Sequence, residues 1–556
     1  MNKSSITLLL FSGCFLGAAT LVQGQETNKG KTIDVTSTFK PVLREASKIN
    51  FNATEPAVDT TKPRLNYNIP AQNLFFTYQP AGVHPVALRV DSLNAWQYSN
   101  YIKAGIGNIH QPFVKAGFSF GDGKRTFFNI FANHYTSKGE LDFQKNSQTS
   151  VGAAATYKTT KNLEWNGSLG FRSDDYYLYG YKPDSLAKNF TKDDLKQRFQ
   201  TIEGKIDFRN LSPTEFGLNY HPSIRVSGFS DNHDPKGSET NTVVNLPLEK
   251  TFGEKFAFDI GATADLTNYK YGDKSNKKSI QNNLYQVATA VSVKTNNLYL
   301  HAGILPSWDQ KTFHMLPNIM ADITTNDKKF TLQLGWVGYY NKGSYQRFAS
   351  INPWLAQPDS LLNTRAIDLF GGIKGSLGDH FSYSAKLGLV TYHNMPLFVN
   401  DTVTAEGGKS FRIRYEPKMN DLQLHSEVGY TIGEQFSATA GLTFNNYFNL
   451  EREKDAYGLI PIELNAAIRW QLLKDLWFYS ELWTWSKPKY LTRNGDSFKG
   501  DNAFDLNAGA EFRITKNFNL WVQLNNLLNN KYQRWNQYEV FGFSILGGIT
   551  YSFNAK

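Results

Sequence analysis

The chain has 556 residues, of which 19% are charged and 40% hydrophobic, and its formal net charge is +10. Cys14 is the only cysteine, which excludes a disulfide framework and argues against a thiolate metal site or a cysteine nucleophile. Lysine and arginine are scattered over the predicted turns and loops rather than clustered, so the positive charge does not indicate a nucleic-acid partner.

Residues 1–24 have the pattern of an export signal. Lys3 supplies a positive start, Ile6–Val22 is apolar or small, and Val22-Gln23-Gly24 resembles a cleavage site. The alternatives are a retained membrane anchor and lipidation at Cys14. Beyond residue 24 no stretch of 18 apolar residues occurs, so no α-helical membrane span is predicted.

Residues 25–96 form a segment of different character. They are rich in Pro, Asn, Thr and Ala, and their periodicity is weak. This composition predicts an N-terminal periplasmic extension or a partial plug, and not an independent core.

From residue 97 to residue 556, apolar and polar residues alternate repeatedly. A period of two predicts β-strands, and stretches of about 9 to 14 residues match the length of a tilted strand that crosses a bilayer. Charged residues such as Glu463 and Arg469 occupy the polar face, which would be costly in a dry core but is tolerated in a wet lumen. The clearest examples are Phe436–Asn445, Ile462–Gln471, Phe504–Arg513 and Phe541–Phe553.

The connections alternate between short turns and long loops. Short turns on one side and long loops on the other are the layout of outer-membrane barrels, with the short turns in the periplasm. Ten short turns, with both chain ends periplasmic, predict about 22 strands, within a range of 16 to 24. The short turns are expected at residues 121–124, 159–162, 212–214, 252–255, 294–297, 326–329, 377–380, 432–435, 473–475 and 514–517, and the long loops near 174–197, 341–365, 393–418, 486–500 and 528–540.

Aromatic residues are abundant and often lie near the predicted strand ends. Interface girdles of Trp and Tyr would explain them. A soluble β-sandwich or propeller is the alternative, but those folds prefer strands of about five or six residues. The residues assigned to the girdles are Tyr98, Tyr101, Trp336, Tyr339, Tyr340, Trp477, Tyr479, Trp483 and Trp485.

The C-terminal part resembles the barrel of TonB-dependent receptors, especially those of Bacteroidota. The segment Asn519–Tyr532 resembles the penultimate strand of that family and the start of the loop after it. Tyr551 and Phe553 resemble the terminal β-signal that barrel-assembly machinery reads, although three more residues follow here. The resemblance covers the last 60 or so residues well and residues 97–490 in architecture only.

The resemblance implies a large barrel whose lumen must be filled, because barrels of this size enclose a wide interior. That family carries a plug of well over a hundred residues, whereas residues 25–96 provide only about 70. Occlusion is therefore expected from residues 25–96, from infolded loops such as 341–365 and 393–418, or from a partner protein. Thr32–Thr36 is similar to a TonB box and equally to any strand-forming pentapeptide, so contact with TonB stays an open alternative.

No motif carries recognisable chemistry, and no catalytic, cofactor-binding or metal-binding residue is predicted. Asp231, His233 and Asp234 share one loop but lack the spacing of a calcium loop, which favours a solvated loop. A tyrosine-rich stretch could stack on sugars or pack within its loop. These tyrosines are Tyr176, Tyr177, Tyr179 and Tyr181.

The sequence thus predicts an all-β transmembrane barrel of the cell outer membrane that is not an enzyme. Its expected role is solute passage or membership of a larger outer-membrane complex. The alternatives are a non-transporting accessory subunit of protein assembly or secretion machinery and, less favoured, a barrel enzyme. Expected partners are outer-membrane lipid, the barrel-assembly machinery during biogenesis, and other outer-membrane or periplasmic proteins.

Overall fold

The computed structural model describes residues 100–122, 124–180, 193–272, 277–401, 409–492 and 494–554. The predicted export signal and N-terminal extension lie outside the described residues, and so do the boundaries predicted at residues 24 and 96. Contacts along the chain separate Met1–Ser47 from Lys48–Lys556, and the description below concerns the second unit.

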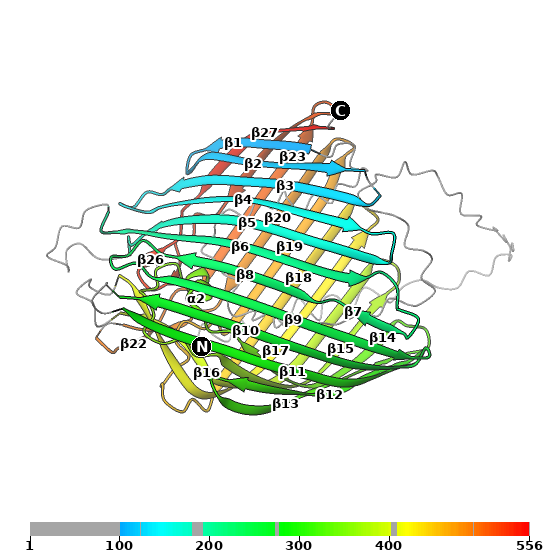
Figure 1. Cartoon of the computed structure of the whole chain (residues 1–556). Coiled ribbons are helices and arrows are strands. Elements are labelled where there is room, and N and C mark those ends of the chain that lie inside the picture. The colour runs from blue at the N-terminus through cyan, green and yellow to red at the C-terminus, as the bar shows by residue number, and fades with distance from the viewer. Residues whose placement is uncertain are drawn as a thin grey trace, which may run out of the picture. The chain divides into compact units, whose positions relative to one another are not determined.

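The described chain forms a closed antiparallel β-barrel of 22 strands (Figure 1), as the sequence predicted. β1 pairs with β27, which closes the ring, and the short strands β7 and β8 both pair with β9 and together make one wall strand. The wall strands are β1 (Asn100–Gly107), β2 (His110–Gly121), β3 (Thr126–Lys138), β4 (Lys145–Lys158), β5 (Leu163–Tyr177), β6 (Lys196–Asn210), β7 (Leu218–Tyr220), β8 (Ser223–Ser230), β9 (Ser238–Phe252), β10 (Phe256–Tyr271), β11 (Lys278–Lys294), β12 (Leu298–Asp309), β13 (Thr312–Thr324), β14 (Phe330–Asn341), β15 (Thr364–Leu377), β16 (Phe381–Asn400), β17 (Phe411–Ile432), β18 (Phe436–Phe448), β19 (Ile462–Leu473), β20 (Leu476–Trp485), β23 (Ala503–Arg513), β24 (Phe518–Asn525) and β27 (Ser544–Phe553).

Five small elements lie in the long loops rather than in the wall. The helix α2 (Tyr345–Ile351) lies between β14 and β15. The strand pairs β21 (Lys489–Leu491) with β22 (Ser497–Lys499) and β25 (Gln533–Trp535) with β26 (Tyr538–Glu539) form two separate small sheets. No helix in the described part of the chain is long and apolar enough to cross a membrane.

All ten predicted short turns connect consecutive wall strands, and the count of 22 follows from them. Local chemistry explains why the chain reverses there. Gly433 adopts φ +50° in the β17–β18 turn, a conformation that residues with a side chain rarely adopt. At the β2–β3 turn, the Asp122 carboxylate accepts hydrogen bonds from the N–H groups of Lys124, Arg125 and Thr126, at 2.8–2.9 Å.

The two faces of the wall differ in polarity, as expected for a barrel in a lipid bilayer. Outward side chains are large and apolar, and Leu169, Leu369 and Ile549 are 60%, 58% and 48% exposed. Inward side chains are polar and often ion-paired, for example Arg209 with Glu164 at 2.8 Å and Lys386 with Asp368 at 2.6 Å. An apolar outer band around a polar interior is the pattern of a transmembrane barrel, so the protein is an outer-membrane barrel.

The predicted aromatic girdle is wrong for β20. Tyr479 and Trp485 are buried and pair with Arg469 and Glu463 of β19, so they face the lumen. Trp477 and Trp483 share that face by alternation. Trp336 is outward and 48% exposed but lies near the middle of β14. The error arose because aromatic content alone does not reveal which face of a strand meets lipid.

The predicted loop at 393–418 is also wrong in part. β16 continues to Asn400 and β17 begins at Phe411, so most of the segment is a strand hairpin. The ladder skips the pair Asn394–Pro417, and Asn394 has φ +56°, which kinks the hairpin. Beyond the kink both faces of β16 are buried, so apolar and polar residues no longer alternate there and the sequence resembles a loop.

Candidate functional site: a seal across the long-loop end

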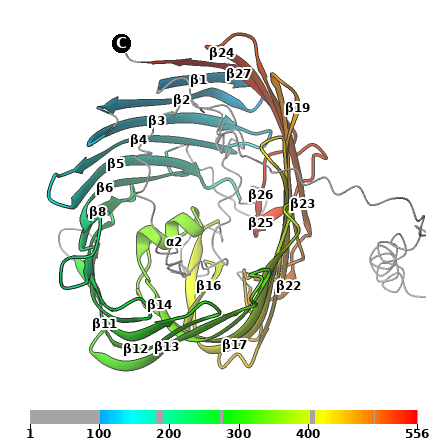
Figure 2. The ribbon, with the colours of Figure 1, turned by 90° about the vertical axis from the view of Figure 1, so that its right-hand side faces the viewer.

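The long-loop end of the barrel is occupied by an infolded segment, residues 342–363, here called the lid. It connects β14 to β15 and carries α2, which lies inside the ring of strands (Figure 2). Its large apolar side chains are buried rather than exposed. They are Tyr345, Phe348, Ile351, Trp354, Leu355 and Leu361, each at most 4% exposed.

The start of α2 is held by two acceptors. The Ser344 side chain accepts a hydrogen bond from the Arg347 N–H at 3.2 Å, as an N-cap does. The buried Glu239 carboxylate of β9 accepts from the N–H groups of Tyr345 and Gln346, at 2.6 and 3.2 Å. A wall carboxylate therefore satisfies helix donors that would otherwise be unpaired inside the barrel.

The Asp231 carboxylate ties the β8–β9 loop to the lid. It accepts hydrogen bonds from the Tyr345 hydroxyl at 2.9 Å, the Gln357 amide at 2.9 Å and the Gly237 N–H at 2.7 Å. Its contact with His233 is 3.0 Å. Burial alone would raise the pKa of Asp231, but the bonds from His233, Gln357 and Gly237 outweigh it and lower the pKa below its usual value.

Asn282 of β11 fixes both ends of the lid. Its amide nitrogen donates to Gly343 O at 2.8 Å and to Asn363 Oδ1 at 2.9 Å. The Asn363 amide donates back to Asn282 Oδ1 at 2.8 Å, and also to Asp309 at 2.7 Å. Asn282 and Asn363 are at most 1% exposed, so this pairing satisfies polar groups that would otherwise be costly to bury.

The lid spans the full width of the barrel. On one side, Trp354 Nε1 donates to Tyr177 O of β5 at 3.0 Å. On the other, Phe411 N of β17 donates to Trp354 O, and Ala356 N donates to Phe411 O, both at 2.9 Å. β5 is the fifth strand of the ring and, with β7 and β8 counted as one, β17 is the sixteenth, so these walls are eleven strands apart in a ring of 22.

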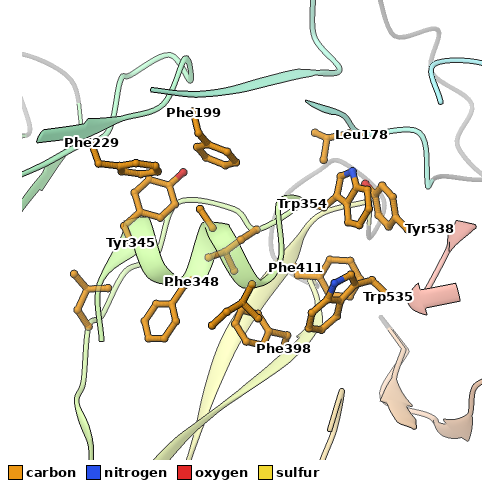
Figure 3. Close-up of a cluster of buried hydrophobic side chains, with 14 of the residues drawn as sticks. Leu178, Phe199, Phe229, Tyr345, Phe348, Trp354, Phe398, Phe411, Trp535 and Tyr538 are labelled. Atoms are coloured by element: carbon orange, nitrogen blue, oxygen red, sulfur yellow. The ribbon is translucent and has the colours of Figure 1, made fainter. Parts of the chain in front are cut away.

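The loop between β24 and β27, residues 526–543, closes over the lid from a third direction. Tyr538 stacks on Trp354 (Figure 3), with ring centroids 3.9 Å apart. The Tyr538 hydroxyl donates to Lys409 O. Asn526 adopts φ +48° and its side chain bonds Asn530 and Phe541, which sets the turn. The segment that resembled a family motif in the sequence therefore directs this loop inward.

The kinked β16–β17 hairpin completes the seal. Phe398, Phe411 and Tyr415 pack in the same buried cluster as the lid aromatics. Leu397 and Val399 pack in a second cluster with residues of the β18–β19 loop. Both loops that the sequence proposed as infolded, 341–365 and 393–418, thus pack within the long-loop end.

The sequence-derived tyrosine stretch lies beside this seal. Tyr177 is buried, and Tyr176 and Tyr179 are half-buried and pack edge-on against Trp354, with centroids 6.4 and 5.8 Å apart. The Tyr179 hydroxyl donates to Glu539 O at 2.7 Å. Tyr181 lies outside the described residues.

The predicted β-signal residues lie at the short-turn end of the closing strand. Tyr551 pairs with Ile102 and Phe553 with Asn100 across the β1–β27 seam. Their rings stack, with centroids 5.3 Å apart. Recognition of these residues by barrel-assembly machinery stays a prediction.

Sequence reasoning missed Asp231, Glu239, Asn282 and Trp354 as parts of the seal. Asp231 was noticed only as a solvated loop residue, whereas it is 3% exposed. The others are isolated polar or aromatic residues whose partners lie far away in sequence, so no local pattern identifies them.

The described residues offer no metal site, since no group of three or more His, Cys, Asp or Glu among them is arranged to hold an ion. Ser292, His301 and Asp259 meet in the lumen, but not as a catalytic relay. Ser292 Oγ donates to Asp259 at 2.7 Å and lies 3.0 Å from His301 Nδ1, while His301 Nε2 contacts Asn318. In a hydrolase triad the carboxylate and the serine lie on opposite ring nitrogens.

No family model matches the sequence, and no curated protein is similar to it. Solved structures do match the fold. The siderophore receptor PirA from Acinetobacter baumannii is 11% identical, with a TM-score of 0.63 over 82% of this chain and 80% of that one. A variant of the ferric enterobactin receptor PfeA from Pseudomonas aeruginosa is 12% identical, with a TM-score of 0.63 and the same coverage.

A third match is the FpvAI–pyocin S2 complex, with 10% identity, a TM-score of 0.61, and coverage of 83% of this chain and 70% of that one. At such identities the likeness shows the fold. The protein therefore has the 22-stranded fold of outer-membrane siderophore receptors and lies in the cell outer membrane.

Proposed function

We propose that the protein is a sealed outer-membrane barrel that works as a component of a larger outer-membrane complex, and not as a diffusion pore or an enzyme. The observation that carries the proposal is the lid, which joins β5 to β17 across the ring. A barrel closed in this way can provide a membrane anchor and a binding surface for other subunits. A diffusion pore, by contrast, needs an open path for solutes through the lumen.

The energy of the seal supports a closed resting state. Burying one large apolar or aromatic side chain contributes about 1.5–3 kcal/mol. Exposing Tyr345, Phe348, Ile351, Trp354 and Leu355 together would therefore cost on the order of 10 kcal/mol. Thermal opening at that cost is negligible, so passage would need a ligand or partner that supplies a comparable free energy.

Solute passage is the second candidate, and the fold favours it. The matched structures include two named siderophore receptors. In this alternative a partner, with TonB as one option, opens the lid, and residues 25–96 act as the partial plug that the sequence suggests. This alternative also includes two proposals: the plug is shorter than that of the TonB-dependent receptors, and the protein originates in Bacteroidota.

Conductance of the purified protein in a planar bilayer tests the seal. We expect the unmodified protein to show no large steady current. Replacing residues 344–357 with a short Gly-Ser linker removes α2 and Trp354, and should open a large, stable pore. The matched control replaces the exposed tip of the β21–β22 hairpin, residues 494–496, and should leave the barrel closed.

The role in a complex needs its own measurement. Gentle detergent extraction followed by mass spectrometry should recover the protein in a fixed stoichiometry with other envelope proteins. Isolation as a lone monomer, together with uptake of a labelled siderophore by cells that carry only this barrel, would contradict the accessory role and favour passage. A large current from the unmodified protein would contradict both the seal and the proposal.

A further inference from the structure

We infer that the outward rim of β15–β17 binds the phosphate-bearing headgroup of an outer-leaflet lipid. Three basic residues form one transverse row there, here called the cationic rung: Arg365, His393 and Lys418. Arg365 pairs with His393 across β15–β16, and His393 pairs with Lys418 across β16–β17. The three side chains therefore lie on one face of three adjacent strands.

That face is the lipid-facing one. Two outward positions below the rung lies the apolar row Leu369, Leu389 and Leu422, which are 58%, 43% and 37% exposed and pair with one another in the same way. Side chains alternate between the two faces of a strand, so residues separated by four positions share a face. The cationic rung therefore lies on the same outward face as the leucine row, nearer the long-loop end of the barrel.

The height of the rung matches the headgroup level. On β15 the outward apolar residues run from Leu377 at the short turn to Ile367. Ten residues of strand span roughly 34 Å, or about 26 Å along the membrane normal at a tilt near 40°. This matches the apolar band of about 25 Å in outer-membrane barrels, and Arg365 is the next outward residue above it.

The rung is also the last outward position before the chain turns inward. The lid begins one residue beyond β14, and the β16–β17 hairpin kinks at Asn394. Above this level β16 and β17 continue only as the kinked hairpin that packs with the lid, so headgroups here meet Arg365, His393 and Lys418.

The charges of the rung are not balanced within the described protein. Arg365 and Lys418 flank His393 on either side, and none of the three residues forms an ion pair with a described carboxylate. Asp309 lies close enough to Arg365 to interact electrostatically, but its carboxylate is bonded by Asn363. The outer rim of β5–β6 differs, since Lys196 and Arg198 there pair with Asp175 at 3.2 and 2.5 Å.

Arg365 is half-buried at the rim. Its Nη1 lies 3.0 Å from His314 Nε2, and its Nε is buried without a hydrogen-bond partner. Tyr340 pairs with Arg365 on the neighbouring strand and supplies an aromatic ring at the same level. Guanidinium and ammonium groups bind the phosphate of a lipid headgroup by charge-assisted hydrogen bonds.

Native mass spectrometry of detergent-purified protein tests the inference, with lipid A and fully dephosphorylated lipid A as probes. The double variant Arg365→Gln/Lys418→Gln removes two cations. The matched control Lys270→Gln removes a single exposed cation at the top of β10, whose neighbours Ser238 and Ser279 are uncharged. Lys418→Gln alone serves as a second variant, because Lys418 is exposed and its loss cannot disturb packing.

Each cation of a cluster that binds a charged headgroup contributes about a five-fold change in binding. We expect a roughly 25-fold loss of lipid A binding in the double variant, about five-fold in Lys418→Gln, and no loss in Lys270→Gln. Heat-modifiable gel migration verifies folding. Equal binding of dephosphorylated lipid A, an unchanged double variant, or full displacement by inorganic phosphate would overturn a lipid headgroup site. These outcomes are independent of whether the lid conducts.

Discussion

Asp231 lies in a loop with His233 and Asp234, where composition suggests a solvated acidic loop. Its carboxylate is instead buried and accepts hydrogen bonds from residues of the lid and of its own loop. A buried carboxylate stays charged because several donors bind it, and removing the charge leaves those donors poorly paired. The lid is therefore anchored by a residue outside it.

We expect Asp231→Asn to loosen the lid without unfolding the barrel. Leaving buried donors unsatisfied costs about 1–3 kcal/mol, which raises local opening roughly 5- to 150-fold. Hydrogen exchange of the Phe348 N–H, which bonds Ser344 O at 3.0 Å, measures this opening. The control is Asp327→Asn in the exposed β13–β14 turn, which should leave exchange in the lid unchanged. Equal exchange in both variants would refute the role of Asp231.

At the scale of elements, the β16–β17 hairpin shows how one residue redirects two strands. Asn394 at φ +56° stands where the ladder skips a pair, and the Thr364 hydroxyl donates to its carbonyl at 2.9 Å. Asparagine tolerates this backbone conformation, whereas β-branched residues do not. The kink lets Phe398 and Phe411 reach the lid.

Asn394→Ile should therefore weaken the contact between hairpin and lid. The strained conformation costs about 1–2 kcal/mol, which the hairpin relieves by straightening. The Phe411 N–H, which donates to Trp354 O, should exchange faster with solvent. Asn394→Gly preserves the φ angle and should behave like the unmodified protein. If the glycine variant exchanges as fast as the isoleucine variant, the kink depends on the asparagine side chain and not on the backbone.

Across the whole molecule, adjacent residues of a wall strand lie in opposite environments. One faces lipid and must be apolar, and the next faces the lumen and can be polar. Leu169 is 60% exposed toward lipid, whereas Ser168 beside it faces the lumen and pairs with Lys205 and Ala154 of the neighbouring strands. A charged side chain that faces lipid is not solvated, whereas one that faces the polar lumen is solvated by water and polar groups.

We expect Leu169→Arg to destabilise the barrel by about 2–4 kcal/mol, because an arginine would enter the middle of the apolar band. Ser168→Arg should cost less than about 1 kcal/mol, since Gly170 leaves open space on the same face. Urea unfolding in lipid vesicles, monitored by tryptophan fluorescence, measures both. Equal destabilisation would place lipid on both faces and contradict the barrel.

Much of the architecture could be predicted from the sequence because its causes are local. Period-two alternation marks each strand, and turn residues such as Gly433 and Asp122 mark each short reversal. Ten such turns were enough to predict 22 strands. The face that carries tryptophans on β20 could not be assigned, since that depends on register with β19.

The sequence by itself determined the barrel, its strand number and its membrane, because alternation and turn chemistry act between residues that are close along the chain. Only the tertiary structure decided the seal. Asp231 meets Tyr345, Trp354 meets Tyr538, and Tyr177 of β5 meets Trp354, in each case more than a hundred positions apart, while Trp354 meets Phe411 of β17 more than fifty positions away. Such contacts depend on the closed ring, which places the long loops side by side, so no local pattern encodes them.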